Sequence, residues 1–241
     1  MPGNIAEAIL GRHSVREGFD GRALEREHLE EIVACGLAAP SSKAAQPWRF
    51  HVATDRAFLA RIAGLVLAAE RADDYMPKDP ATGRPRIGLV STVAESADIL
   101  RSASVAIFVE NLGAFSTSRR AVANSPSDVR EDVLLGYAFE LIGIGAAVEN
   151  MWLAAHALGI EGVFMGDLLI AEDKIRAMLQ IENDLAGALV LGTTTAPQSS
   201  SAGERLDQDR ATTKRGPHEL PEAKDEGSGV VELDRVVWLP R

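Results

Sequence analysis

Apolar residues recur every three or four positions in several stretches of the chain, and this spacing predicts amphipathic helices. The stretches cover residues 5–12, 29–37, 58–66, 128–158 and 171–179. Pro40 follows the second stretch and marks the end of that helix, because proline cannot continue the helical hydrogen-bond pattern. The stretch from 128 to 158 contains no proline, so we expect one long central helix there.

Shorter apolar runs predict β-strands between these helices. Residues 48–52 alternate between apolar and polar side chains, as expected for a strand with one face in a core. Residues 104–110 form a β-branched apolar run that is typical of a buried strand. Residues 162–167 predict a strand that runs into a glycine turn, and residues 188–191 predict another strand. The sequence therefore predicts strands interleaved with helices, without an internal repeat.

Two segments break the apolar pattern before the central helix. Residues 71–90 carry three prolines among charged residues, which predicts a surface excursion that could act as a lid. Residues 115–127 predict a second loop, where Arg119 and Arg120 are either solvated or in contact with a substrate or nicotinamide. We therefore expect the region 71–127 to include a lid or substrate-contact segment.

The C-terminal part of the chain changes in composition. Residues 194–229 are rich in threonine, serine, proline, glycine and charge, and only 230–231 and 236–239 recover an apolar pattern. Such a segment cannot form a core by itself. We therefore expect a domain over residues 1–195 and an extension over 196–241 that wraps around a partner subunit.

The composition of the chain argues against some classes of binding partner. The 241 residues are 46% hydrophobic and can bury a substantial core, while a net charge of -10 opposes binding to nucleic acid or to an anionic membrane. Leu141 to Val148, the most apolar segment, is far shorter than the roughly 20 residues of a membrane helix. Cys35 is the single cysteine, and the N-terminus lacks the pattern of a secretory signal. We therefore predict a cytoplasmic protein.

A basic segment at residues 12–16 is the first candidate for chemistry. Arg12, His13, Ser14 and Arg16 place two guanidinium groups and a hydroxyl at the end of a predicted helix. Such a set suits a phosphate, which takes several charge-assisted hydrogen bonds in a fixed array. The alternative is an exposed basic turn, and charge alone favours that alternative.

Several motifs together resemble those of the flavin-dependent nitroreductase family. The motifs are Arg-His-Ser-Val-Arg at 12–16, Ala39-Pro40-Ser41-Ser42 with Gln46-Pro47-Trp48, Glu149-Asn150-Met151 with Leu153-Ala154-Ala155 and Leu158-Gly159-Ile160, and Lys214-Arg215. Alone, the second motif would be an ordinary connection between a helix and a strand. Their order and spacing agree with the family over residues 4–217, most clearly in the first 50 residues and in 140–192.

The resemblance implies an α+β fold with a nitroreductase-like mixed sheet flanked by helices, in an intertwined homodimer with FMN at the subunit interface. It implies an FMN-dependent oxidoreductase that passes a hydride from NADH or NADPH through the flavin to a small electron-poor acceptor, such as a nitroaromatic or a quinone. Donor and acceptor would use one pocket in turn, in a ping-pong mechanism. The five histidines show no metal-ligand spacing among themselves or with Cys35, so we predict no metal site. We name no catalytic acid or base, because the acceptor can take protons from solvent.

Site residues follow from the matching motifs. Arg12 and Ser14, with His13 between them, would hold the phosphate or ribityl chain, and Arg16 would face the pyrimidine edge of the flavin. The remaining cofactor contacts implied by the resemblance are Pro40, Ser41 and Ser42 from the other subunit, Met165 and Gly166 with a backbone amide near flavin N5, and Lys214 and Arg215 at the phosphate.

One position departs from the family pattern. Ala44 stands where members often carry asparagine, whose amide would contact flavin or substrate. This departure, together with the atypical region 71–127, leaves two alternatives open. One is a specialised flavin enzyme of the same fold that dehalogenates or dehydrogenates a biosynthetic intermediate. The other is a flavin-binding protein without turnover.

Overall fold

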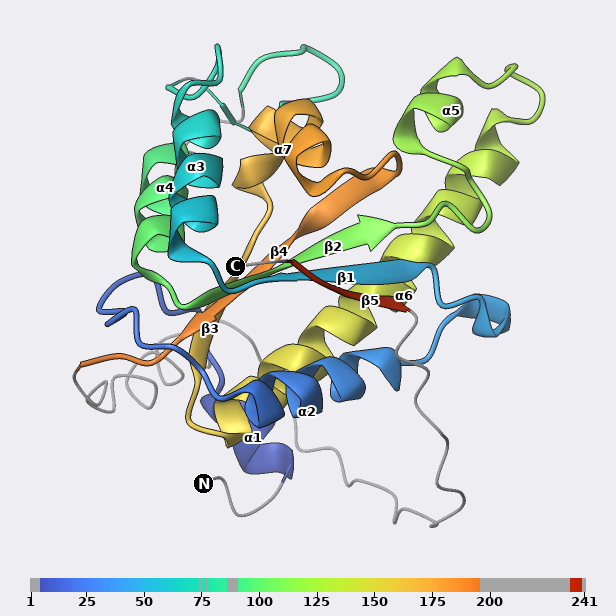
Figure 1. The fold of residues 1–241 in the computed structure, drawn as a ribbon. Helices are drawn as coiled ribbons and strands as arrows, with labels where there is room; N and C mark the ends of the chain where they lie inside the picture. Colours follow the sequence, from blue (N-terminus) through green and yellow to red (C-terminus); the bar gives the residue numbers. More distant parts are fainter. Residues whose placement is uncertain (1–4, 74, 77, 86–90, 196–234, 240–241) are drawn as a thin grey trace, which may run out of the picture.

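The computed structural model describes residues 5–73, 75–76, 78–85, 91–195 and 235–239. Its strands are β1 (Trp48–Ala53), β2 (Val105–Asn111), β3 (Glu161–Met165), β4 (Asp184–Gly192) and β5 (Val236–Trp238). They form one sheet in the order β3-β4-β2-β1-β5. β5 runs parallel to β1 and the other neighbours are antiparallel, so the sheet is mixed (Figure 1).

Helices cover both faces of this sheet. α1 (Ile5–Gly11), α2 (Arg26–Leu37) and α6 (Arg130–Ala157) lie on one face. α3 (Arg56–Leu67), α4 (Val93–Ser102), the 3-10 helix η2 (Asp167–Ala171) and α7 (Glu172–Leu179) lie on the other. The short helices η1 (Ser42–Ala44) and α5 (Arg119–Asn124) lie toward one end of the sheet (Figure 1). The α+β architecture with a mixed sheet flanked by helices is confirmed.

Side-chain alternation along β1 divides the core into two layers. Trp48, Phe50 and Val52 pack with α2 and α6, while Ala53 packs with α3 and α4 on the opposite face. Successive side chains of a strand point to opposite faces, so one strand supplies both layers. His51 points to the same face as Ala53, on the α3 side, and is buried although it is polar.

Most predicted elements are confirmed, but some differ. Residues 93–102 form α4, which the apolar pattern did not indicate, and α5 lies within the predicted loop 115–127. β4 begins at Asp184, before the predicted 188. β3 ends at Met165, so Gly166 follows the strand, as expected for the predicted glycine turn. Among the described helices, none is both long enough and apolar enough to cross a bilayer.

Candidate functional site

The basic segment is fixed against the first residues of β3. The Arg12 backbone N–H donates to the Ala8 carbonyl at 3.0 Å, so the segment continues directly from α1. Ser14 forms a parallel bridge with Gly162, and the Val15 N–H donates to the Gly162 carbonyl at 2.9 Å. Val15 is buried, and neighbouring side chains of extended backbone alternate in direction. Ser14 and Arg16 therefore point away from the core.

The Arg12 guanidinium lies against α6. Its Cζ is 4.2 Å from the ring centroid of Trp152, and its Nε is 3.0 Å from Glu149 Oε1. That contact is an ion pair without a hydrogen bond, and within the described chain the buried Nε has no hydrogen-bond partner. Stacking on an aromatic ring orients a guanidinium without using its N–H groups. Arg12 thus retains donor capacity for an anion.

Arg16 and His13 differ in how firmly they are held. The Arg16 side chain is 53% exposed, and its Nε lies 3.8 Å from Glu95 Oε2, which is itself half-exposed. An exposed pair of this kind contributes less than about 1 kcal/mol. His13 Nδ1 donates to the Gly11 carbonyl at 3.1 Å, which turns the ring back toward α1. Arg16 is therefore the more available of the two for a ligand.

Met165 and Gly166 lie at the other end of the same strand. Met165 is buried, whereas a Cβ added to Gly166 would meet nothing within 4 Å. The Gly166 carbonyl accepts from the Leu169 N–H at 3.0 Å as η2 begins. From Gly162 to Met165 the strand advances about 10 Å. The structure therefore places the basic segment beside the start of β3 and the Met165–Gly166 turn at the end of β3, with an open backbone at the turn.

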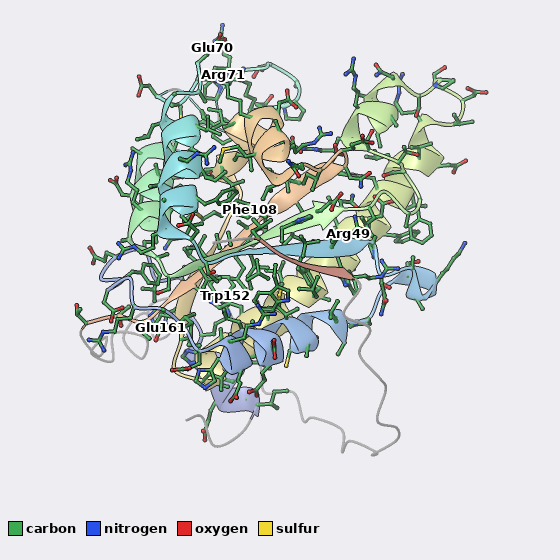
Figure 2. The ribbon with its side chains drawn as sticks, in the orientation of Figure 1. Arg49, Glu70, Arg71, Phe108, Trp152 and Glu161 are labelled. Atoms are coloured by element: carbon green, nitrogen blue, oxygen red, sulfur yellow. The ribbon has the colours of Figure 1, made fainter. Side chains whose placement is uncertain are left out.

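The segment of Pro40, Ser41 and Ser42 lies elsewhere in the chain. A Cβ at Gly143 of α6 would be 3.2 Å from Ser41 Cβ, whereas Arg12 stacks on Trp152 of the same helix. Nine helical residues advance about 13.5 Å and turn half a revolution. Figure 2 likewise shows Arg49, which closely follows the Pro40 loop, well separated from Trp152. One chain does not bring the two predicted halves of the site together.

The loop after Pro40 has an unusual backbone. Lys43, Ala44 and Gln46 have φ angles of 52°, 52° and 44°, in the left-handed region that non-glycine residues seldom adopt. Ser41 Oγ accepts a hydrogen bond from the Gln46 N–H at 2.8 Å, which closes the loop. Lys43 and Ala44 are exposed, so the loop projects from the protein surface.

Lys214 and Arg215 lie outside the described residues, so their predicted place at the phosphate stays a prediction. Arg119, weighed above as a substrate contact, instead forms ion pairs with Glu172 and Asp184. The same cluster surrounds Tyr137, and burial raises the pKa of Tyr137 to about 12, although the nearby Arg119 acts in the opposite direction.

A cluster of buried polar side chains lies on the α3 side of the sheet and was not predicted from the sequence. His51 Nε2 and Glu110 Oε2 are 2.8 Å apart, and the Asn183 amide donates to Glu110 Oε1 at 2.6 Å. Arg49 Nη1 lies 3.6 Å from Glu110 Oε2. Burial raises the pKa of Glu110, but these hydrogen bonds and neighbouring positive charge outweigh it and hold the pKa below the usual 4.5. Polar residues at alternate positions of β1 were the available sign.

A cavity of about 500 Å³ lies beside η2 and the start of α7. Tyr75, Leu169 and Ile170 supply apolar surface, and Glu70 and Arg71, which are labelled in Figure 2, also line the cavity. Its volume is within the range of small-molecule sites. The cavity is therefore bounded partly by the segment predicted as a lid and partly by the helix that follows the Gly166 turn.

Comparison with solved structures shows the same fold. A protein described as a nitroreductase from Desulfovibrio desulfuricans, in complex with FMN, is 24% identical, with 83% of this chain and 92% of that chain covered and a TM-score of 0.52. A BluB-like flavoprotein from Clostridium difficile 630 is 21% identical, with coverage of 84% and 97% and a TM-score of 0.59. Nitroreductase A from Vibrio parahaemolyticus is 19% identical, with coverage of 90% and 77% and a TM-score of 0.55.

The family model of the nitroreductases matches residues 9–193, which include the basic segment, the Pro40 loop and the Met165–Gly166 turn. That match covers most of the chain and agrees with the observed mixed sheet. This chain belongs to the nitroreductase family.

Proposed function

We propose that this chain is an FMN-dependent oxidoreductase that passes a hydride from NADH or NADPH through the flavin to a small electron-poor acceptor, a nitroaromatic or a quinone, by a ping-pong mechanism. The observation that carries the proposal is the placement of the basic segment and the open Gly166 turn at the two ends of β3 in a nitroreductase-family fold. An elongated ligand with an anionic end and a planar end would meet both.

The residues present fit this cofactor. The buried Nε of Arg12 lacks a hydrogen-bond partner among the described residues, and Ser14 and Arg16 point away from the core. At Gly166 a ring could approach the backbone, because no side chain stands in the way. When bound, FMN would supply the hydride chemistry.

The proposal assigns a separate role to each of these residues. Arg12 and Ser14 would donate to the phosphate end, where Arg12 is already oriented by Trp152. Arg16 would lie at the pyrimidine edge of the ring, where a positive charge stabilises the negative charge that develops on reduction. Protons for the acceptor would come from solvent, so no side chain is assigned as a general acid or base.

We further propose that the working form is a homodimer. Ser41 packs at Gly143 and Arg12 at Trp152, on opposite sides of α6, and a second copy that supplies the Pro40 loop would let one FMN contact both sets. The apolar side chains left exposed on α6 and α1 support this assembly, which would bury them. We do not propose nucleic acid or a membrane as a partner. We propose a cytoplasmic location, which the single cysteine of the sequence suits.

A second candidate function is a specialised flavin reaction of the same fold, such as dehalogenation or dehydrogenation of a biosynthetic intermediate. The observation that favours it is Ala44, which is exposed on the Pro40 loop but offers only a methyl group where the family often has an amide. Such a site would accept a different substrate without losing the cofactor.

The test is spectroscopic. The purified protein should carry a bound-flavin absorbance, NADH or NADPH should bleach it without oxygen, and a nitroaromatic or quinone should restore it. Bleaching with no response to either acceptor would favour the specialised reaction. Colour that neither nucleotide bleaches would favour a flavin-binding protein without turnover or an enzyme with another donor. A protein that cannot be reconstituted with FMN would overturn the proposal.

A further inference from the structure

The last described strand contacts the Pro40 loop. β5 pairs with β1 from Phe50 opposite Val236 onward, and the Leu239 N–H donates to the Val52 carbonyl at 3.0 Å. Arg235 directly precedes β5, and its guanidinium donates to the Gln46 carbonyl. A residue near the C-terminus of the chain is thus hydrogen-bonded to the loop that leads into the first strand.

The other end of β5 is also fixed. The Arg26 guanidinium lies over the Trp238 ring, with its Cζ 3.1 Å from the ring centroid. Arg26 belongs to α2, the helix that leads into the Pro40 loop. β5 is therefore anchored to the body of the protein at both ends and along β1, so Arg235 is a donor of fixed position.

The loop that Arg235 contacts has a backbone conformation that non-glycine residues disfavour. Gln46, whose carbonyl Arg235 binds, is itself in the left-handed region, as are Lys43 and Ala44. This region is disfavoured for residues that carry a Cβ, and it persists only where surrounding contacts hold it. Within the loop, the Ser41 hydroxyl and the turn bond from the Ala44 N–H to the Ser41 carbonyl at 3.1 Å contribute. Arg235 adds a charged hydrogen bond from outside the loop.

We propose that Arg235 is a positioning residue for the cofactor: by binding the Gln46 carbonyl it holds residues 41–46 in the disfavoured conformation from which Ser41 and Ser42 meet FMN. Arg235 itself need not touch the flavin. The inference rests on the proposed function, because it takes the Pro40 loop as an FMN contact. It also gives the C-terminal strand a role in cofactor affinity beyond closing the sheet edge.

The experiment compares Arg235→Ala, Arg235→Lys and Arg22→Ala in the full-length protein. Arg22 is an exposed arginine paired with Asp20, apart from the loop, and serves as the control. FMN affinity is measured by quenching of flavin fluorescence, and hydrogen exchange of the amides of residues 44–46 is measured without FMN. Arg235→Ala should raise the Kd for FMN about tenfold, the usual effect of losing one charged hydrogen bond, and should speed exchange in the loop.

Arg235→Lys should recover most of the affinity and protection, because a lysine can still donate to the carbonyl, and Arg22→Ala should match the wild type. Unchanged affinity in Arg235→Ala, or weaker affinity with unchanged loop exchange, would overturn the inference. If the wild-type protein bound no FMN, the proposed function would fail, whereas the exchange data would still show whether Arg235 holds the loop. Arg235→Lys preserves the charge, so it also keeps the comparison valid should Arg235→Ala fold poorly.

Discussion

Arg16 differs from Arg12 in what its charge can do. Arg12 is stacked and paired on α6, whereas Arg16 is half-exposed with only a loose contact to Glu95. In the proposed site Arg16 would affect the electronics of the ring more than the anchoring of the phosphate. The two arginines should therefore give different phenotypes when they are removed.

For Arg16→Ala we expect a lower flavin reduction potential and a reduction by NADH or NADPH that is about tenfold slower, which corresponds to roughly 1.4 kcal/mol in the barrier. The Kd for FMN should change less. Potentiometry and anaerobic stopped-flow measurements test this. Arg101→Ala, which removes an exposed arginine paired with Asp98 on α4, is the matched control. Reduction kinetics equal to the wild type would remove Arg16 from its assigned place.

The buried carboxylate of Glu110 leads to a separate prediction about how the stability of the protein depends on pH. Its side chain is 1% exposed, and its pKa is held below the usual 4.5. A carboxylate with a lowered folded-state pKa stabilises the protein above its unfolded pKa, and this contribution is lost as the pH falls through the folded value. The protein should therefore lose stability steeply below about pH 4.5.

Glu110→Gln should cost about 2 kcal/mol at pH 7, because it removes hydrogen bonds to a charged acceptor, and should flatten the loss of stability as the pH falls below the usual carboxyl pKa of 4.5. Urea unfolding at several pH values measures both effects. Glu30→Gln changes an exposed carboxylate on α2 and should leave the slope as it is in the wild type. Identical slopes for wild type and Glu110→Gln would mean that Glu110 does not titrate as the geometry indicates.

Among the elements, those with a regular apolar period were predictable. α6 and β2 appear close to their expected bounds because each buries a continuous apolar stripe or run. α4 follows a proline-rich stretch, and its buried positions are partly alanine and serine, which give a weak apolar signal. α5 has six residues and no buried side chain, so only its Ser118 N-cap could have indicated it. Capping, without periodicity, does not distinguish a short helix from a turn.

The candidate site was predictable in its parts and not in its assembly. The residues of the 12–16 segment could be assigned from their types, but their position beside β3 depends on a bridge between Ser14 and Gly162. The bond from Arg235 to Gln46 joins residues 189 positions apart, and no local pattern reports such a contact. Spatial neighbours of this kind arise from sheet topology, which apolar periodicity alone does not determine.

β4 contains a glycine, Gly187, whose backbone conformation and close packing could not be predicted from apolar periodicity. Gly187 has φ of 145°, and the register between β2 and β4 shifts between Val109 and Glu110, where a bulge lies. A Cβ at Gly187 would lie 2.5 Å from Phe164 Cζ and 2.7 Å from the Met165 carbonyl oxygen. A glycine there weakens the strand signal in the sequence and at the same time lets β4 pack against β3.

Gly187→Ala should therefore destabilise the protein by about 3 kcal/mol, through backbone strain together with a clash against backbone that cannot move aside. Gly64→Ala is the contrasting control, because a Cβ on that helical glycine of α3 meets nothing within 4 Å. That variant should gain about 0.5–1 kcal/mol from helix propensity. Urea midpoints compare the two, and a Gly187→Ala protein as stable as the wild type would contradict the strain.

At the scale of the whole molecule, one surface is unusually apolar. Leu135, Phe139 and Ile142 recur on one side of α6, and Ile142 is 69% exposed. Leu134 and Leu141 flank them, also exposed. α6 is apolar on nearly all sides in this region, as expected for a helix that packs against something on both sides. The proposed homodimer would cover this surface and bring the Pro40 loop of one copy to the basic segment of the other.

Ile142→Glu tests the dimer and the shared site together. The side chain is exposed in the single chain, so the change should leave folding intact, but in a dimer it would bury a carboxylate without a partner, which costs several kcal/mol. Light scattering should show a wild-type dimer and a monomeric variant, and the Kd for FMN should rise at least tenfold because one half of each site is lost. Leu67→Glu places the same charge at an exposed leucine of α3, on the opposite face of the sheet, and should remain a dimer that binds FMN normally. A monomeric wild type with full FMN affinity, or a monomeric Ile142→Glu that binds FMN as tightly as the wild type, would show that one chain completes the site alone.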